Sequence, residues 1–286
     1  MSEPISIELL DAGDPAIRRR LVDFLASHET RVMFILGNLR AGAPQTSFYL
    51  ARRQDEWLGV AAYFGRHRSF TPFSLDPEVT RLLTRHVAGL HPQIEWLNGL
   101  QEIAAPALAE LLRRGHQADN DPRQVFMELD GLPPVQPWEN ACRLHRPEDA
   151  PAVVRLMRFL RGGDPDAPAT ERELANVRSN AQRWVLECEG QIVATAATSG
   201  LAIEACQIIG VATDPRYRRR GFARSVCARL VRDMAGEGAR RTVLFTNVDN
   251  TAAQRCYQGL GFRITGDYCL AKFKLAQSEG EMATLR

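Results

Sequence analysis

Two segments in the second half of the chain combine residue types and spacings that suit phosphate and acyl chemistry. The first, residues 211–223, reads VATDPRYRRRGFA and joins an apolar strand-like run to an amphipathic helix-like run. Gly221 and Ala223 are small, so an anion can approach the free N–H groups of the helix start, whose dipole favours negative charge. Guanidinium groups, which pair well with phosphate, surround this turn: Arg216, Arg218, Arg219, Arg220 and Arg224. The segment predicts a pyrophosphate site; a solvated basic face and nonspecific nucleic-acid binding are the alternatives.

The second segment, residues 250–262, reads NTAAQRCYQGLGF. Asn250 is suited to cap a helix and to offer its amide to a ligand. Ala253 and Tyr257 are four residues apart, so they share one helix face, and the small residue leaves a slot beside the phenol. The alternative interpretation is that Tyr257 is an ordinary core aromatic.

Strands and helices alternate around these two segments. The expected elements are a strand at 142–144, a helix at 148–160, a hairpin at 184–188 and 192–196, a strand at 203–211, a helix from Gly221, a strand at 242–246, a helix at 250–258 and a strand at 269–275. This order predicts an α/β fold, or α+β in some schemes, built on a mixed sheet.

The first half repeats this order faintly, which indicates an internal duplication. A hairpin is expected at 49–53 and 57–62, and a strand at 94–98 precedes a helix that contains Ala104 and Ala105. Where the second half has its arginine turn, the first has the acidic run SLDPEV, and Ala109 stands in the place of Tyr257. The proline-rich segment at 131–137 is interpreted as an interdomain linker.

Composition excludes several classes of protein. The 286 residues, 45% of them apolar and 24% charged, are typical of a globular chain of two domains. No apolar run approaches the ~20 residues that a bilayer span needs, and the start of the chain does not resemble a signal peptide, so we expect a cytoplasmic protein. The six cysteines form no CxxC pair, and no metal is expected.

The two halves of the chain differ in net charge. Up to residue 140, 14 basic residues stand against 18 acidic ones, whereas 22 stand against 16 afterwards. Only two lysines occur, Lys272 and Lys274, both on the expected last strand, which argues against lysine-based covalent catalysis.

The two segments, in this order and spacing, resemble the GNAT superfamily of acyl-coenzyme A-dependent N-acyltransferases over residues 142–275. The resemblance implies two GNAT-like domains, each with a mixed, mostly antiparallel sheet flanked by helices. It implies a degenerate domain at 1–131, a linker at 132–140, a catalytic domain at 141–276 and a tail at 277–286. The residues that it assigns to coenzyme A are Ile209, Gly210, Val211, Arg218, Arg219, Arg220, Gly221, Phe222, Ala223, Arg224, Asn250 and Ala253.

The resemblance also implies catalytic roles. Tyr257 would protonate the departing thiolate, and Glu204, on the strand before the turn, would take the proton of the amine. Glu204 and Val211 are an odd number of residues apart, so they share a face only if a β-bulge intervenes, as it often does in this family. The alternatives are a water relay and an ordinary exposed position for Glu204, and Glu187 and Glu189 are weaker candidates.

The expected function is therefore transfer of an acetyl group from acetyl-CoA to a primary amine of a small molecule, by direct attack in a ternary complex. A noncatalytic acyl-CoA-binding regulator and an acetyltransferase acting on protein amines remain as alternatives. Nucleic-acid and membrane partners are not expected, and the protein is expected to be a monomer or a homodimer. The first domain would complete the acceptor pocket or stabilise the fold.

Overall fold

The computed structural model describes residues 3–42, 44–180 and 182–274. The expected tail at 277–286 and the strand position Leu275 lie outside these residues. Contacts divide the chain into two compact units. Unit 1 comprises the described residues of Met1–Val125 and Gly266–Arg286, and unit 2 comprises those of Phe126–Thr265.

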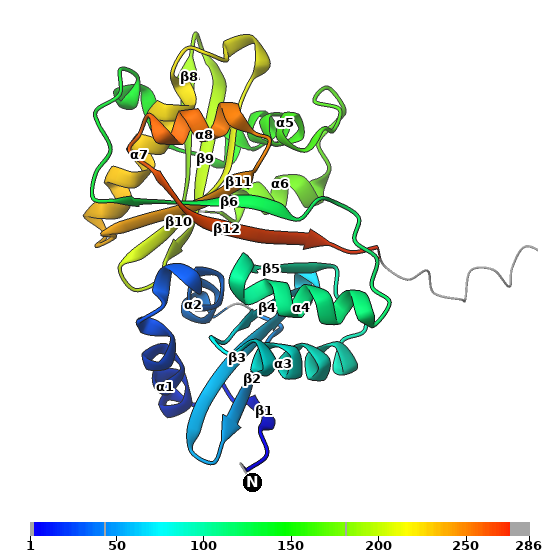
Figure 1. The fold of residues 1–286 in the computed structure, drawn as a ribbon. Coiled ribbons are helices and arrows are strands. Elements are labelled where there is room, and N and C mark those ends of the chain that lie inside the picture. Colours follow the sequence, from blue (N-terminus) through cyan, green and yellow to red (C-terminus); the bar gives the residue numbers. More distant parts are fainter. Residues whose placement is uncertain (1–2, 43, 181, 275–286) are drawn as a thin grey trace, which may run out of the picture. The chain divides into compact units, whose positions relative to one another are not determined.

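Unit 1 is a sheet with helices on both faces. Its elements are β1 (Ser6–Leu10), α1 (Pro15–Ala26), α2 (Met33–Ala41), β2 (Thr46–Arg53), β3 (Glu56–Phe64), β4 (Ser69–Phe73), α3 (Pro77–Leu90), β5 (Trp96–Leu100) and α4 (Gln101–Arg113). The strand order is β1-β2-β3-β4-β5, and only the β4–β5 pair is parallel. Helices α1 and α2 lie on one face, and α3 and α4 lie on the other (Figure 1).

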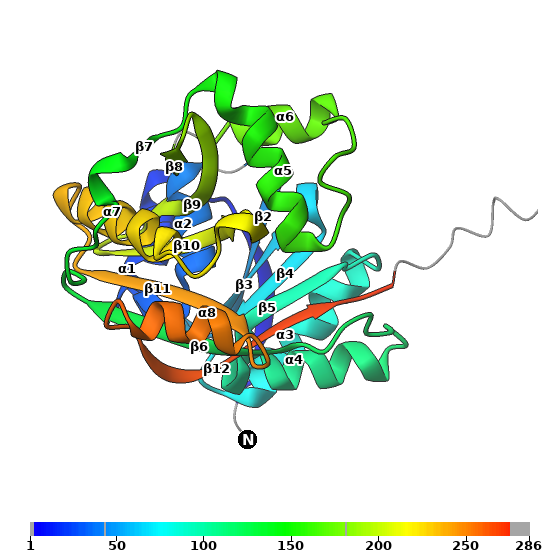
Figure 2. The same cartoon turned by 90° about the horizontal axis from the view of Figure 1, so that it is seen from above.

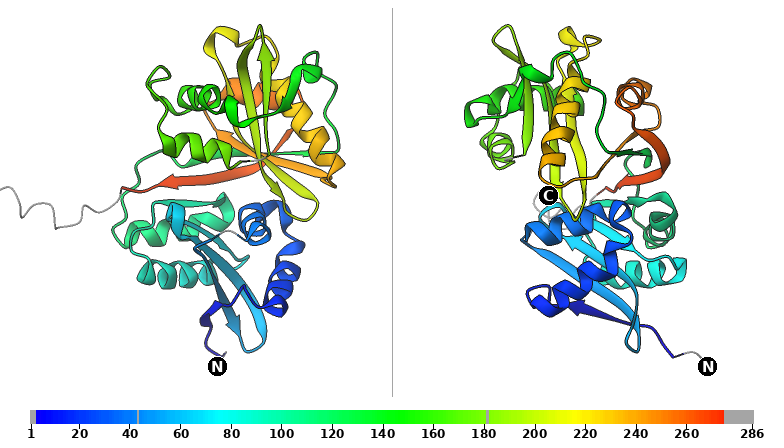
Figure 3. Two further views of the ribbon diagram at one scale, coloured as in Figure 1. Left: turned by 180° about the vertical axis from the view of Figure 1, so that it is seen from behind. Right: turned by 90° about the vertical axis from the view of Figure 1, so that its left-hand side faces the viewer.

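Unit 2 repeats this plan. Its elements are β7 (Cys142–Leu144), α5 (Ala150–Arg161), α6 (Glu171–Arg178), β8 (Arg183–Cys188), β9 (Gln191–Leu201), β10 (Ala205–Thr213), α7 (Phe222–Gly236), β11 (Arg241–Asn247) and α8 (Thr251–Gln258). The strand order is β7-β8-β9-β10-β11, and again only the fourth and fifth strands pair in parallel. Helices α5 and α6 lie on the opposite side of the β8–β9 hairpin from α7 (Figures 2 and 3).

The order β-α-α-β-β-β-α-β-α thus occurs twice. It confirms the expected fold class of two domains, each with a mixed, mostly antiparallel sheet flanked by helices. The residues pack as their periodicity predicts: Val153, Val154 and Leu174 of α5 and α6 bury their apolar faces against Val185 of β8.

Two further strands, β6 and β12, contain the points at which the chain passes from one unit to the other. The boundaries between the units therefore differ from the expected domain boundaries. Strand β6 (Arg123–Asp130) was expected to end the first domain, but it joins the sheet of unit 2 beside β11. Strand β12 (Arg263–Lys272) was expected to close the second domain, but from Tyr268 to Lys272 it pairs antiparallel with β5 of unit 1. By contacts, the division therefore falls at 125/126 and 265/266 instead of around 132–140.

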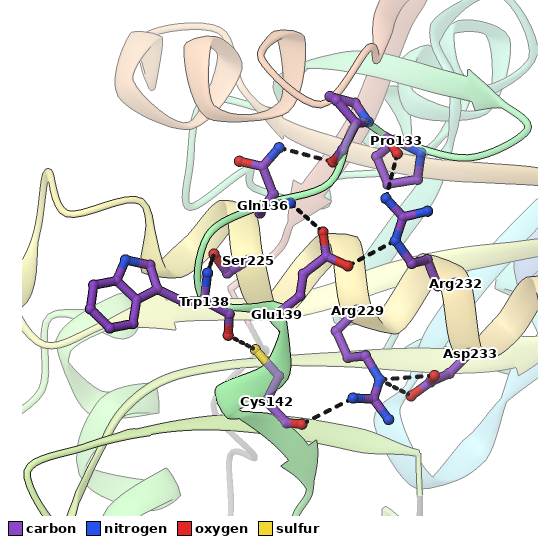
Figure 4. Close-up of polar contacts among 10 residues, drawn as sticks. Pro133, Gln136, Trp138, Glu139, Cys142, Ser225, Arg229, Arg232 and Asp233 are labelled. Carbon is purple, nitrogen blue, oxygen red and sulfur yellow. Dashed lines mark hydrogen bonds and ion pairs between the residues drawn. The ribbon is translucent and has the colours of Figure 1, made fainter.

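The segment expected to be a linker is packed along α7, within unit 2 (Figure 4). The Ser225 hydroxyl accepts a hydrogen bond from the Trp138 N–H at 3.3 Å, and the Trp138 ring meets Phe222 edge-on. Arg232 donates to the Glu139 carboxylate at 2.8 Å and to the carbonyl of Pro133 at 2.7 Å. This segment holds α7, whose first residues belong to the expected phosphate site.

Candidate functional site

The candidate site lies where two parallel strands separate. Strands β10 and β11 pair only from Ala205↔Arg241 to Gln207↔Val243. Both strands then continue, to Thr213 and to Asn247, without pairing to each other. This separation leaves backbone groups on the facing edges of both strands available to a ligand.

A bulge accompanies the separation. Between Ile209 and Ala212 the register of β10 against β9 shifts. This shift is a β-bulge of the kind that the resemblance implies for this strand. Gly210 lies at the shift with φ +59°, a left-handed conformation that favours glycine. A Cβ on Gly210 would also approach the Met157 thioether methyl to 3.3 Å. Glycine is therefore favoured here by the backbone conformation.

Asp214 fixes the turn that follows β10. The side chain is buried and accepts hydrogen bonds from the backbone N–H of Arg216 at 3.0 Å and from its guanidinium at 2.9 Å. It also accepts from Arg155 of α5 at 3.0 Å. The hydrogen bonds from Arg216, with the charge of Arg155, lower the pKa of Asp214 to about 2. One carboxylate therefore ties the arginine turn to α5.

We expect Asp214→Asn to lower the free energy of unfolding by about 2 kcal/mol at pH 7, because the shift from an ordinary carboxyl pKa to about 2 is worth that much. The lowered pKa makes this contribution complete above pH 4 and loses it as pH falls toward 2. Urea unfolding at pH 7 and pH 3 should show the difference between wild type and variant shrinking at the lower pH. Asp130→Asn, which breaks the exposed ion pair with Arg263, is the control and should cost under about 1 kcal/mol. An equal loss in both variants would contradict the anchoring role.

The start of α7 is shaped to receive an anion. Gly221 caps the helix with φ +84°, and no side chain makes a cap hydrogen bond. The first turn contains no acidic residue, and the first helical hydrogen bond runs from the Ser225 N–H to the Gly221 carbonyl at 3.0 Å. The N–H groups of the three preceding residues, 222–224, are therefore the free donors of the helix start. Arg219, before the cap, has φ +64° and lies in the same turn.

A pocket of about 460 Å³ opens at this point. It is bounded by α5, the end of β10, the arginine turn, α7 and α8, all within unit 2. The lining residues are Phe159, Leu160, Val211, Ala212, Thr213, Tyr217, Arg218, Arg219, Gly221, Phe222, Ala223, Arg224, Asn250, Ala252, Ala253, Cys256 and Tyr257. The hydroxyl of Thr213 is buried and has no hydrogen-bond partner in the described part of the chain.

Helix α8 brings the second sequence segment into this pocket. Asn250 caps the helix by accepting a hydrogen bond from the Ala253 N–H at 3.1 Å. Tyr257 is 8% exposed, and its ring contacts that of Phe262 edge-on at 6.0 Å. Burial raises the pKa of the Tyr257 phenol well above 10, so the phenol keeps its proton at neutral pH.

The structure brings most of the expected site residues together. Ten of them line the pocket: Val211, Arg218, Arg219, Gly221, Phe222, Ala223, Arg224, Asn250, Ala253 and Tyr257. Ile209, Gly210 and Arg220 are not among the lining residues; Gly210 shapes the bulge, and the Arg220 guanidinium lies over the Tyr217 ring at 5.1 Å. Phe159 and Leu160 were missed because nothing in the sequence of α5 marks them as ligand-facing.

Glu204 is not brought to the pocket. It precedes β10, at the opposite end of the strand from the arginine turn, and its carboxylate lies 3.4 Å from the Arg240 guanidinium. The strand begins two residues later than expected. Seven residues separate Glu204 from Val211, which at ~3.3 Å per residue is about 23 Å. The bulge that would align the two residues is present, but the distance prevents Glu204 from taking a proton in the pocket.

Unit 1 carries a different helix start at the equivalent place. In α3, Asp76 accepts a hydrogen bond from the Glu78 N–H at 2.8 Å, Pro77 lacks an N–H, and Glu78 adds negative charge to the first turn. Asp76 thus occupies an N–H group, and the negative charges of Asp76 and Glu78 repel an anion. At the equivalent positions α7 offers free N–H donors to an anion. Ala109, in the place of Tyr257, is exposed on α4.

The described residues contain no group of three or more His, Cys, Asp or Glu side chains placed to hold a metal ion. Within the same residues, no helix combines the length and apolar character of a membrane span.

Part of the second half of the chain is similar to a known family. Residues 150–262 match the model of the Acetyltransferase (GNAT) family. No curated protein matches the chain.

Solved structures resemble the chain over nearly its whole length. A GCN5-related N-acetyltransferase from Sphaerobacter thermophilus is 18% identical, with a TM-score of 0.60 over 96% of this chain and 98% of the other. A tandem GNAT protein from the clavulanic acid biosynthesis pathway is 14% identical, with a TM-score of 0.56 over 96% and 100%. A Drosophila protein is 15% identical, with a TM-score of 0.64 over 93% and 98%. At these identities the likeness shows the fold alone.

Proposed function

We propose that the protein transfers an acetyl group from acetyl-CoA to a primary amine of a small molecule, because residues 150–262 match the GNAT acetyltransferase family model. The observation that carries the proposal is the pocket that joins the free helix start of α7 to the protonated phenol of Tyr257. One end of this pocket suits a pyrophosphate, and the other suits a leaving thiolate.

The residues present fit acetyl-CoA. The N–H groups at the start of α7, with Arg218, Arg219 and Arg224, would hold the pyrophosphate. The pantetheine arm would lie in the gap between β10 and β11, where the edge of β10 near Val211 offers backbone groups and Thr213 a free hydroxyl. The largely apolar walls, including Phe159 and Leu160, suit the rest of the arm.

Direct attack by the amine accounts for the groups in the pocket. The amine nitrogen forms a bond to the thioester carbon and loses a proton to water, the C–S bond breaks, and Tyr257 gives its proton to the departing sulfur and regains one from water. A thiol has a pKa near 8.5, so a thiolate is a good leaving group and needs only modest help from a proton donor. Cys256 is the cysteine of the pocket, and burial raises its pKa to about 11, which keeps it a poor nucleophile for an acetyl-enzyme intermediate.

The lining residues include no carboxylate and no imidazole among the described part of the chain. The proton of the attacking amine therefore leaves through water in this proposal. The rate should rise with pH as the neutral form of the amine becomes more abundant.

The experiment is thiol-release turnover with acetyl-CoA across amino acids, polyamines, other small amines and lysine-containing peptides. We expect turnover with a small amine, and mass spectrometry should find no acetylated enzyme without acceptor. Turnover with peptides alone would move the acceptor to proteins. Binding of acetyl-CoA without turnover on any amine would instead indicate a noncatalytic acyl-CoA-binding protein.

A further inference from the structure

Arg183, the first residue of β8, is a buried cation without an anion. The residue is 7% exposed. Its Nη1 donates to the Thr195 hydroxyl at 3.2 Å and lies 3.9 Å from the Met157 sulfur, whereas its Nε has no partner. No carboxylate of the described residues forms an ion pair with it. Burying an unpaired charge is costly, and such groups are normally paired.

The surroundings show how strongly this charge is disfavoured. Burial, with a smaller contribution from the like charge of Arg161, lowers the pKa of Arg183 to about 10. The guanidinium still carries its charge at neutral pH. Thr195 holds it in place, because the Thr195 hydroxyl donates to the Trp184 carbonyl at 2.9 Å and accepts from Arg183.

The position of the guanidinium relates it to the acyl-transfer pocket. Nη1 lies 3.6 Å from where a Cβ on Gly210 would stand, so it is directly beside the β10 bulge. Val211, the next residue, lines the pocket. Met157 covers the same spot, 3.3 Å from that Cβ position, and a methionine side chain is flexible enough to move aside for a ligand.

We propose that Arg183 is a specificity-determining residue, and that it binds a carboxylate carried by one of the two substrates beside the β10 bulge. The inference rests on the proposed function. An α-amino acid acceptor would carry the carboxylate next to its attacking amine; a dicarboxylic acyl chain on coenzyme A is the other source of the same group. The planar guanidinium, with Nε unpartnered, matches the two oxygens of a carboxylate.

The test compares α-amino acids with the matching amino-acid amides at equal concentrations of neutral amine. With acetyl-CoA and wild-type protein, we expect the acids to have at least a tenfold higher kcat/KM. In Arg183→Met the KM for the acids should rise at least tenfold with little change in kcat, while turnover of the amides should stay within twofold. Arg183→Lys keeps a positive charge but lacks the paired N–H donors of a guanidinium, so it should recover only part of the affinity for the acids.

Two further arms separate the outcomes. With amide acceptors, we expect a lower kcat/KM for succinyl-CoA than for acetyl-CoA. If the kcat/KM for succinyl-CoA is instead higher, and this preference is lost in Arg183→Met, Arg183 binds a carboxylate that the acyl chain carries. Thermal unfolding of Arg183→Met should show a Tm equal to or above that of wild type, because the variant removes an unpaired buried charge. A lower Tm with equal loss for acids and amides would overturn the inference and make Arg183 structural. If wild type uses acids and amides equally and does not prefer succinyl-CoA, this inference fails and the proposed function stands; if it uses no amine, the proposed function itself fails.

Discussion

Gly221→Val is expected to weaken acetyl-CoA binding at least tenfold. Gly221 caps α7 with φ +84°, a conformation that a β-branched residue adopts only with strain. Relief of that strain would turn the N–H groups of residues 222–224 away from the pyrophosphate, and each charge-assisted hydrogen bond lost is worth about 1.5–3 kcal/mol. Isothermal titration of the full chain with acetyl-CoA measures the change in Kd.

Gly238→Val is the matched control for this prediction. Gly238 follows the other end of α7, has φ +107°, and has open space around its Cβ position, as Gly221 does. Both variants should lose about 1–3 kcal/mol of stability from backbone strain, but only the first should lose affinity. Equal affinities in the two variants would show that the helix start does not bind the anion.

Tyr257→Phe is expected to lower kcat by about a hundredfold, because a positioned general acid typically contributes that much or more. The substitution keeps the ring that contacts Phe262, so the fold and the Kd for acetyl-CoA should change little. Since the pKa of Tyr257 is raised well above 10, wild-type kcat should show no alkaline decrease up to pH 9.5. Steady-state turnover over this pH range, in wild type and variant, measures both effects.

Tyr217→Phe provides the comparison. Tyr217 also lines the pocket, but it lies in the arginine turn, where its ring contacts the guanidinium of Arg220. Its hydroxyl has no role in the proposed reaction, so kcat should stay within about threefold. A Tyr257→Phe enzyme with wild-type kcat would remove Tyr257 from the mechanism.

Local sequence could predict the core of the site because each part of it has a local physical cause. The left-handed cap at Gly221, the Asn250 cap of α8 and the helical spacing of Ala253 and Tyr257 all follow from neighbouring residues. The same is true of the β8–β9 hairpin, whose turn at Glu189 and Gly190 has positive φ at both residues. These features did not depend on distant parts of the chain.

The features that sequence could not predict depend on contacts between distant residues. Strands β6 and β12 have the same alternating pattern whichever sheet they join, so their exchange between the units left no local sign. Glu204 is an exception, because the seven residues that separate it from Val211 already predict its distance from the pocket. Asp214 lies in the arginine segment, but its ion pair with Arg155 links residues 59 apart.

The number of acetyl-CoA molecules bound per chain shows whether the proposed acyl-CoA site is confined to unit 2. Titration calorimetry of the full chain should give one acetyl-CoA bound per chain, because α7 offers a free helix start whereas α3 is capped by Asp76 and carries Glu78. A stoichiometry of two, or no binding at all, would contradict the account.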